Sequence, residues 1–303
     1  MNISIVIATF NRARLLGETL ESLSVALEDS PHPEVEVIVI NNRSTDATPS
    51  VASGYSTRIP SFRLIEESQQ GLSYARNRGV EEASGDIVVF LDDDVELEPR
   101  WLEYLIAPFE NADVGVVGGK VLPYQNSTIP AWLPRRYSYL ASVFDPRDDD
   151  GPIEKVMGAN FAVRRDACRS SGGFDVNLGR KGTKLLGGEE VALFNAMRAR
   201  GMCVWYAPGS VVRHKIDAKL KPEYIEDYAY WLGVSESYLD RRFTSKLKWL
   251  LKQVRSRVFP WVAYPFERMR ARTLTDWMLC VIRREYARGY RNGIPVDAVE
   301  DKL

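Results

Sequence analysis

Five consecutive apolar residues, Ile87 to Leu91, end abruptly in three adjacent aspartates, Asp92, Asp93 and Asp94. A continuous apolar run of this length predicts a strand that is buried on both faces of a sheet. Neighbouring carboxylates repel one another and aspartate is a poor strand former, so folding alone gives no reason for the cluster. Oxygen donors at the carboxyl end of a buried strand favour a hard divalent cation, either Mg2+ or Mn2+. The alternative is a solvated turn with incidental acids.

Strand-like and helical patterns alternate along the first hundred residues. The strand-like runs cover residues 3–8, 35–40, 62–65 and 87–91, and helical spacing covers residues 14–27 and 71–83. Because the strands are almost continuously apolar, this alternation predicts an α/β fold in which a mostly parallel sheet is covered by helices on both faces.

The remainder of the chain is less regular. We expect a strand over 114–122 that is interrupted by two glycines, a helix over 189–200, and two strands over 204–206 and 210–213. Residues 148–151 predict a mobile loop, and helices rich in aromatic residues follow Asp217.

Composition excludes several classes of protein. The net charge of -1 over 303 residues gives no case for nucleic-acid binding, and three scattered cysteines indicate neither a disulfide framework nor a zinc site. The first residues enter a strand pattern directly and no long apolar run occurs, so we expect a cytoplasmic protein without a signal peptide or a transmembrane helix.

Three of the early strands end in polar residues: 9–12, Asn41–Asn42 and 92–94. The carboxyl ends of parallel strands meet at one edge of a sheet, so residues about 80 positions apart can line one crevice there. Amides, hydroxyls and backbone N–H groups suit a nucleotide, and the acids suit a metal that bridges its phosphates. Side-chain alternation on an extended backbone would place Asp92 and Asp94 on one face and Asp93 on the other.

These segments resemble the family 2 glycosyltransferases. The resemblance rests on residues 4–12, 36–46, 71–77 and 85–94, and it continues through 158–160, 172–175 and 188–190. It implies the GT-A fold, a nucleotide-diphosphate sugar as donor, and inversion at the anomeric carbon. It also implies a catalytic domain over 1–216, with a nucleotide-binding half (1–115) and an acceptor half (116–216), followed by a helical region over 217–303.

The resemblance also implies roles for individual residues. Asn42 falls where the family contacts the nucleobase, Asp94 at the direct metal ligand with Asp92 as its partner, and Asp93 near the ribose. Asn160 falls where donor sugar and acceptor meet. The residues expected at the donor are Thr9, Phe10, Arg12, Asn41, Asn42, Arg76, Asn77, Asp92, Asp93 and Asn160.

Two later positions complete this expected site. Glu190 falls at the catalytic base, but the usual Glu-Asp pair is Glu189-Glu190 here, so either residue could accept the proton. An acid that favours a helix N-terminus is the alternative for Glu190. His214 falls where related enzymes often carry a metal ligand, which would favour Mn2+. A structural hydrogen-bonding role is its alternative.

A basic stretch runs from Arg241 to Arg272, where ten Lys or Arg residues stand against one acid, Glu267. Its apolar residues at 247, 250, 251, 254 and 258 recur at helical spacing. The pattern predicts either an amphipathic helix at the inner face of a membrane, or a helical cap that packs on the catalytic domain or on a second subunit.

The favoured function is metal-dependent transfer of one sugar to a hydroxyl acceptor, with a lipid-linked or polysaccharide precursor as acceptor and a UDP-sugar as donor. The chain lacks the Q-x-x-R-W motif that is associated with processive members of the family. The alternatives are a nucleotidyltransferase on a similar scaffold and a non-catalytic sugar-nucleotide binding module.

Overall fold

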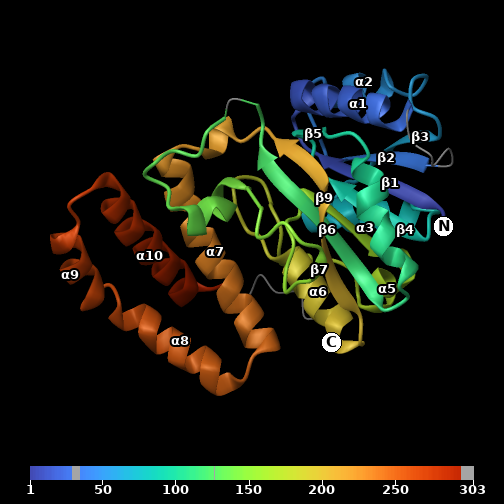
Figure 1. Cartoon of the computed structure of the whole chain (residues 1–303). Coiled ribbons are helices and arrows are strands. Elements are labelled where there is room, and N and C mark those ends of the chain that lie inside the picture. The colour runs from blue at the N-terminus through green and yellow to red at the C-terminus, as the bar shows by residue number, and fades with distance from the viewer. Residues whose placement is uncertain (29–34, 126, 295–303) are drawn as a thin grey trace.

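The computed structural model describes residues 1–28, 35–125 and 127–294 (Figure 1). Its strands are β1 (Ile3–Thr9), β2 (Val35–Asn41), β3 (Phe62–Glu66), β4 (Ile87–Leu91), β5 (Val95–Leu97), β6 (Val114–Pro123), β7 (Gly151–Pro152), β8 (Asn160–Arg164) and β9 (Cys203–His214). Its α-helices are α1 (Ala13–Glu28), α2 (Thr48–Ser53), α3 (Leu72–Glu82), α4 (Trp101–Ile106), α5 (Arg165–Ser170), α6 (Glu189–Ala199), α7 (Pro222–Phe243), α8 (Lys246–Val258), α9 (Ala263–Arg270) and α10 (Leu274–Asn292).

The strands form one sheet in the order β3-β2-β1-β4-β8-β6-β9-β5, with β7 paired to β9. Strands β3, β2, β1 and β4 are mutually parallel, and so are β6 and β9. Strand β8 lies antiparallel between β4 and β6, while β5 and β7 run antiparallel to β9. The predicted mostly parallel α/β sheet is therefore confirmed.

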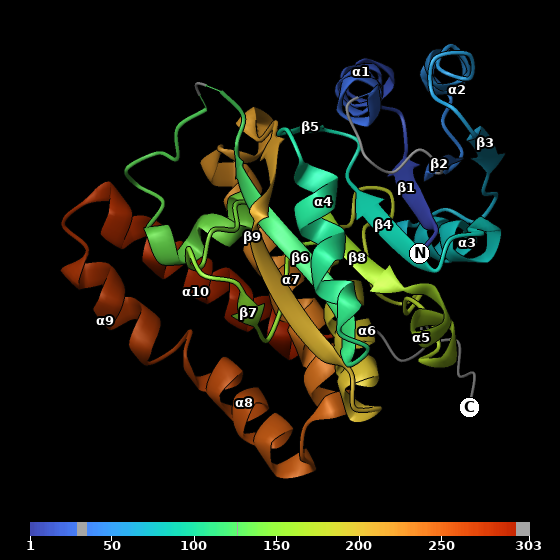
Figure 2. The same cartoon turned by 45° about the vertical axis from the view of Figure 1, so that its right-hand side comes forward.

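Helices cover both faces of this sheet, as the apolar strands require. Ile5 and Ile7 of β1 face a core shared with α1, α2 and α4, whereas Val6 faces a second core with α3, α5 and α6. Figure 2 shows α1 and α2 on one side of β1 and β2, and α3 on the other. Burial on both faces leaves the carboxyl ends of the strands as the natural place for polar groups.

The second half of the sheet differs from the prediction in three places. The two strands expected over 204–206 and 210–213 are one strand, β9, which pairs with β6 through a register shift at Gly119. The expected mobile loop ends at Gly151, which begins β7. The three-residue strand β5 was not predicted, and its antiparallel pairing with β9 sets Val95 opposite His214.

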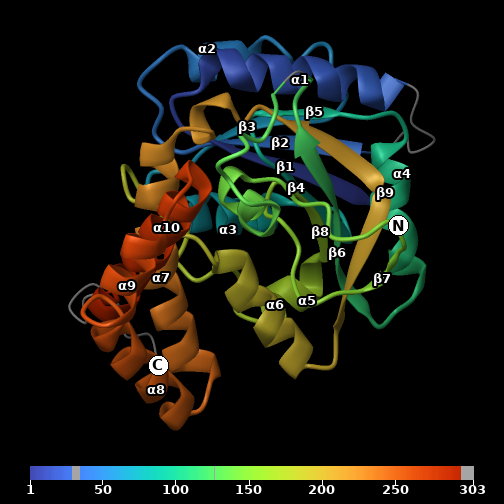
Figure 3. The ribbon, with the colours of Figure 1, turned by 60° about the vertical axis from the view of Figure 1, so that its left-hand side comes forward.

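The C-terminal helices pack beside the sheet around a third core (Figure 3). Leu140 and Ala141 from the middle of the chain join Ile225 of α7 and Met278 of α10 in that core. Within residues 1–28, 35–125 and 127–294, no helix combines the length and the apolar character that crossing a bilayer requires.

Candidate active site

The three aspartates lie directly beyond the end of β4, beside the loop that follows β1. Thr9 donates its hydroxyl to Asp93 Oδ2 at 2.7 Å, and Arg12 donates to Asp94 Oδ2 at 2.6 Å. The same nitrogen of Arg12 lies 3.2 Å from Asp93 Oδ1. Asp92 and Asp94 lie together as expected, but Asp93 shares the Arg12 cation with Asp94 instead of facing away from it, because the extended backbone ends at Leu91 and a turn follows.

Burial and neighbouring charges give Asp93 and Asp94 pKa values that differ in opposite directions from the ordinary value. Burial raises the pKa of Asp93 to about 6, although the charge of Arg12 opposes this shift. Burial would also raise the pKa of Asp94, but the charges of His214 and Lys219 outweigh it and hold that pKa well below its usual range. Asp92 is the most exposed of the three, with 32% of its side chain accessible.

His214 reaches this cluster from the end of β9. Its Nε2 atom lies 2.7 Å from Asp94 Oδ1 and 3.9 Å from Asp92 Oδ2. Its Nδ1 atom lies 3.2 Å from the Ser142 carbonyl oxygen, an acceptor that can hold a proton on Nδ1 and so leaves Nε2 as the nitrogen that could bind a metal.

Asp92, Asp94 and His214 fit a divalent metal. Each of the three residues offers one ligand atom, and these atoms all lie within 4.8 Å of one another. This set of two carboxylate oxygens and one imidazole nitrogen suits Mn2+ better than Mg2+, because Mg2+ prefers a shell made only of oxygen atoms.

Cations of the chain itself also approach this cluster. Lys219 Nζ lies 3.5 Å from Asp94 Oδ2 and 2.8 Å from His214 Nε2, and Arg12 contacts the same carboxylate. A metal ion would compete with these groups for Asp94. Sequence reasoning missed Lys219; the only available signal was the concentration of lysines directly after His214, at 215, 219 and 221.

Arg76 connects the acidic cluster to the glutamate pair at the start of α6. Its side chain is 4% exposed and donates to Glu189 Oε1 at 2.6 Å and to the Gly158 carbonyl at 2.9 Å. It also lies 3.7 Å from Asp92 Oδ1. Glu189 is therefore held in a buried ion pair, so the two glutamates have different environments although they are adjacent in sequence.

Glu190 lines a cavity and stays close to Glu189 and Arg76. The residue keeps some exposed surface, but its Oε2 atom is buried and has no hydrogen-bond partner among the described residues. Burial, followed by the negative charge of Glu189, raises the pKa of Glu190 to about 8, against the opposing charge of Arg76.

The cavity beside Glu190 has a volume of about 870 Å3 and lies between the sheet domain and α7. Its walls are largely apolar, and they include Phe144, Met157, Leu232 and Leu239. The cavity continues to Lys252 of α8, so a buried carboxylate and a surface helix line one space.

Four expected donor residues hold neighbouring loops in place. The Asn41 side chain binds Glu66, and Asn42 accepts from the Gly71 N–H at 2.7 Å. The Asn77 amide bonds to both the N–H and the carbonyl of Phe174. Asn160 is fully buried, accepts from Trp101 Nε1 at 2.8 Å and donates to Ser210, which places it apart from the open part of the site. Contact of these four residues with a donor stays a prediction.

The loop residues after β1 remain accessible. Phe10 is 38% exposed, and the Arg12 side chain is 39% exposed. The Asn42 N–H donates to the Thr9 carbonyl at 2.9 Å, so the loops after β1 and β2 lie side by side. The structure thus brings the polar ends of β1, β2 and β4 to one edge of the sheet, as expected for parallel strands.

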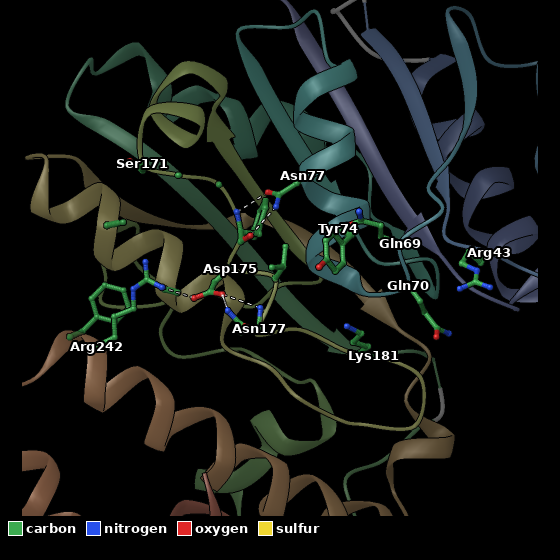
Figure 4. A pocket seen from close by; sticks show the side chains of 17 residues that line it. Arg43, Gln69, Gln70, Tyr74, Asn77, Ser171, Asp175, Asn177, Lys181 and Arg242 are labelled. Atoms are coloured by element: carbon green, nitrogen blue, oxygen red, sulfur yellow. Dashed lines mark hydrogen bonds and ion pairs between the residues drawn. The ribbon is translucent and has the colours of Figure 1, made fainter. Parts of the chain in front are cut away.

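A second pocket, of about 750 Å3, lies apart from these acids (Figure 4). It lies between Tyr74 and Asn77 of α3, the loop that carries Asp175, and the end of α7. Arg242 of α7 donates to Asp175 Oδ2 at 2.8 Å across this pocket. Its described lining includes neither the three aspartates nor Glu190, so we place the chemistry elsewhere.

Comparisons with known proteins show the family of this chain. The family model described as glycosyl transferase family 2 matches residues 4–172, which is more than half of the chain. A glucosyl-dolichyl phosphate glucuronosyltransferase of Haloferax volcanii is 28% identical over 79% of this chain and 78% of its own length. Glycosyltransferase AglE of the same organism is 31% identical, over 58% of this chain and 57% of its own length.

Solved structures share the fold. A mannosyltransferase from Pyrobaculum calidifontis, determined in complex with GDP-Man and Mn2+, superposes with a TM-score of 0.67 at 17% identity. The match covers 96% of this chain and 87% of that one. GalNAc-T7, determined with UDP, GalNAc and Mn2+, has a TM-score of 0.56 over 77% of this chain and 48% of its own.

Proposed function

This chain belongs to glycosyl transferase family 2 and is a sugar-transferring enzyme, and we propose that it transfers one sugar from a nucleotide-diphosphate donor to an acceptor hydroxyl with inversion. The observation that carries this proposal is the different environment of two adjacent glutamates. Glu189 is paired with Arg76, whereas Glu190 lines the cavity. A carboxylate in that position can accept a proton from an acceptor that enters the cavity.

We assign the donor to the edge of the sheet formed by the loops after β1, β2 and β4. Thr9 and Arg12 orient Asp93 and Asp94, and the exposed surface of Phe10 and Arg12 is available to the nucleotide. Asp92, Asp94 and His214 would hold Mn2+ or Mg2+, which supplies Lewis-acid neutralisation of charge on the leaving diphosphate. Arg12 and Lys219 are close enough to that cluster to bind phosphate oxygens as well.

Glu190 then acts as the general base. Its pKa of about 8 gives the carboxylate a high proton affinity, which favours removal of the hydroxyl proton as the acceptor oxygen attacks. Arg76 and Glu189 form the rigid support beneath it. We accordingly assign residues 1–216 to catalysis, with the donor half over 1–115 and the acceptor half over 116–216. The helical region predicted over 217–303, which the structure describes as far as residue 294, completes the acceptor cavity.

The apolar cavity favours an acceptor with a hydrophobic part. Phe144, Leu232 and Leu239 offer apolar surface next to Glu190 that could contact such a part, and polar residues of the same lining remain for the sugar. One relative is named a glucosyl-dolichyl phosphate glucuronosyltransferase, and another is named a succinoglycan biosynthesis protein. A lipid-linked precursor of a polysaccharide or glycan is therefore the acceptor class that we propose.

A thermal-shift panel tests the donor. UDP-, GDP-, dTDP- and CMP-sugars are compared with and without Mn2+, because a ligand that binds only the folded state raises the Tm. We expect the sugars of one nucleotide, with UDP favoured, to give the largest rise in Tm. The Asp94→Asn variant should lose the part of that rise that depends on Mn2+. Equal shifts for all donors, or none, would contradict the donor site.

Transfer itself is tested with Glu190→Gln. We expect this variant to keep the donor-induced shift and to lose roughly 100- to 10,000-fold in turnover, the usual contribution of general-base catalysis. Retained turnover would remove Glu190 from the mechanism. Incorporation of a nucleotide with release of diphosphate from a nucleoside triphosphate would instead identify a nucleotidyltransferase, and donor binding without transfer in the unaltered chain would identify a binding module.

A further inference from the structure

We infer that α8 and the segment after it, residues 246–272, form a docking face for a bilayer that contains anionic phospholipid. We call residues 246–272 the basic face. This inference concerns a surface away from the acidic cluster, and it holds whether or not the proposed donor and acceptor are right.

Helix α8 exposes its apolar side and buries polar residues. The side that faces α7 and α10 contains Gln253 and Ser256, which are 6% and 5% exposed. Gln253 donates to Ser237 of α7 at 3.0 Å and to the Tyr290 carbonyl at 3.1 Å. The five apolar residues that recur at helical spacing are instead open to solvent: Leu247 (67%), Leu250 (43%), Leu251 (61%), Val254 (55%) and Val258 (48%).

These five side chains form one stripe, because an α-helix advances by about 100° per residue and they fall within an arc of about 100°. On the same projection Lys246 and Arg257 border the stripe on one side, and Lys248 and Arg255 border it on the other. Among the cations of α8, only Lys252 pairs with a carboxylate, that of Asp240, in the part of the chain that the structure describes. An apolar stripe bordered by cations is the pattern of helices that lie in a membrane interface.

The apolar surface continues beyond α8. Four more apolar side chains are exposed there: Trp261 (81%), Val262 (66%), Phe266 (50%) and Met269 (78%). A large apolar patch of this kind is costly to leave in contact with water. Figure 1 shows α8 and α9 at the outer side of the C-terminal helices, farther from the sheet than α7. Tryptophan is favoured at the boundary between lipid headgroups and acyl chains.

Charge selects the lipid over a second copy of the chain. The basic face and the two arginines before it carry ten Lys or Arg residues and one acid, Glu267, and that acid already pairs with Arg283. A symmetric dimer through this face would bring two sets of these cations together, which is unfavourable. Anionic headgroups offer the complementary charge, and the acyl region accepts the apolar stripe.

The position of this face relative to the cavity is consistent with a lipid surface. Lys252 of α8 and Thr244, just before the helix, line the same cavity as Glu190. A bilayer against the basic face would therefore lie next to one end of that cavity.

Vesicle flotation of the full chain tests the inference without any donor or acceptor. We expect flotation with vesicles of phosphatidylcholine and phosphatidylglycerol at low salt, and little with phosphatidylcholine alone. The variant Lys248→Gln/Arg255→Gln/Arg257→Gln should partition roughly 100-fold more weakly, because it removes the attraction of three cations to anionic headgroups. The variant Leu247→Gln/Leu251→Gln/Val254→Gln should also lose binding to the anionic vesicles.

Matched substitutions on another surface serve as controls. Val25 on α1 is 55% exposed, and Arg169 and Arg200 are exposed cations outside the basic face. The variant Val25→Gln and the pair Arg169→Gln/Arg200→Gln should float like the unaltered chain. An equal loss of flotation in these control variants would overturn the inference. So would a lack of vesicle binding together with a concentration-dependent dimer that the Leu247→Gln/Leu251→Gln/Val254→Gln variant abolishes.

A spectroscopic measurement covers the case in which a triple variant fails to fold. Brominated acyl chains quench a tryptophan only when it enters the bilayer, and Trp261 is the exposed tryptophan of the basic face. We expect quenching in the unaltered chain and a clear reduction in Trp261→Phe. Quenching that Trp261→Phe leaves unchanged would show that this face is not the one in contact with lipid.

Discussion

Arg76 donates to the carboxylate of Glu189 at 2.6 Å in an ion pair in which both side chains are 4% exposed. The same guanidinium lies 3.7 Å from Asp92, so one buried cation stands between the proposed metal cluster and the glutamate pair. Because Glu189 is committed to this contact, its neighbour Glu190 is the glutamate that lines the cavity.

Arg76→Met should strongly destabilise the fold. Removing the cation leaves the Glu189 carboxylate buried and uncompensated, which typically costs about 3–5 kcal/mol. Urea unfolding followed by circular dichroism measures this change. The matched control is Arg78→Met on the same helix, whose side chain is 40% exposed and pairs with Glu82, so its loss should stay below about 1 kcal/mol. Similar losses for the two variants would mean that the buried pair contributes no more than a surface pair.

Activity should rise with pH through the titration of Glu190. A base must be deprotonated, and the pKa of this carboxyl in the donor-free protein is raised to about 8. The plot of log kcat/KM against pH should therefore have an ascending limb with an apparent pKa near 8. A limb near the ordinary glutamate value would show that Glu190 is not the proton acceptor or is not desolvated in solution.

The same shift predicts a pH-dependent stability. The folded state holds the Glu190 proton more tightly than the unfolded state, so the free energy of unfolding should fall as pH rises from the ordinary value of 4.5 toward about 8. Glu190→Gln lacks this titration. Its Tm relative to the unaltered chain should increase between acidic and alkaline pH, and a constant difference across that range would contradict the buried carboxyl.

Lys219→Met should bind Mn2+ more tightly when no donor is present. The ammonium lies 3.5 Å from Asp94 Oδ2 and competes for the proposed ligand, so its removal should raise the Mn2+ affinity by roughly tenfold, equivalent to about 1.4 kcal/mol. Titration followed by the electron paramagnetic resonance of free Mn2+ measures this. Lys221→Met is the control, because Lys221 lies two positions further along the chain and its removal changes the net charge by the same amount. An unchanged affinity in Lys219→Met would show that this lysine does not compete for the site.

Gly289→Ala should disrupt the crossing of α7 and α10. A Cβ at Gly289 would lie 1.8 Å from the Tyr230 carbonyl oxygen, which is backbone and cannot move without shifting α7. Such overpacking costs about 1–3 kcal/mol or more, and the Tm should fall. Gly17→Ala is the control, because the new Cβ would meet only a side-chain atom of Val51, at 3.2 Å. A Tm for Gly289→Ala that matches this control would mean that the helix crossing is adaptable.

Much of the fold could be predicted from the order of residues. The apolar runs at 3–8, 35–40 and 87–91 are local patterns, and burial on both faces follows from their composition. The polar residues that end these strands gather at one edge because parallel strands share a direction. That grouping needs no information beyond the strand assignments, whereas the contact between Thr9 and Asp93 depends on the turn that follows Leu91.

The tertiary structure decided the distinctions within the site. His214 meets Asp94 across 120 positions through the register of β5 and β9, and β5 is too short for a periodic signal. Adjacent Glu189 and Glu190 differ only because Arg76 and Gly158 lie on one side of α6.

The orientation of α8 shows the same division. Its sequence predicts an apolar stripe between cations, but that stripe could equally have packed inward. Gln253 takes the inward side instead, through bonds to Ser237 and Tyr290. Sequence periodicity determines which residues share a face, because it reports the repeat of a single element. Which face is buried depends on contacts between distant segments, and only the assembled fold contains them.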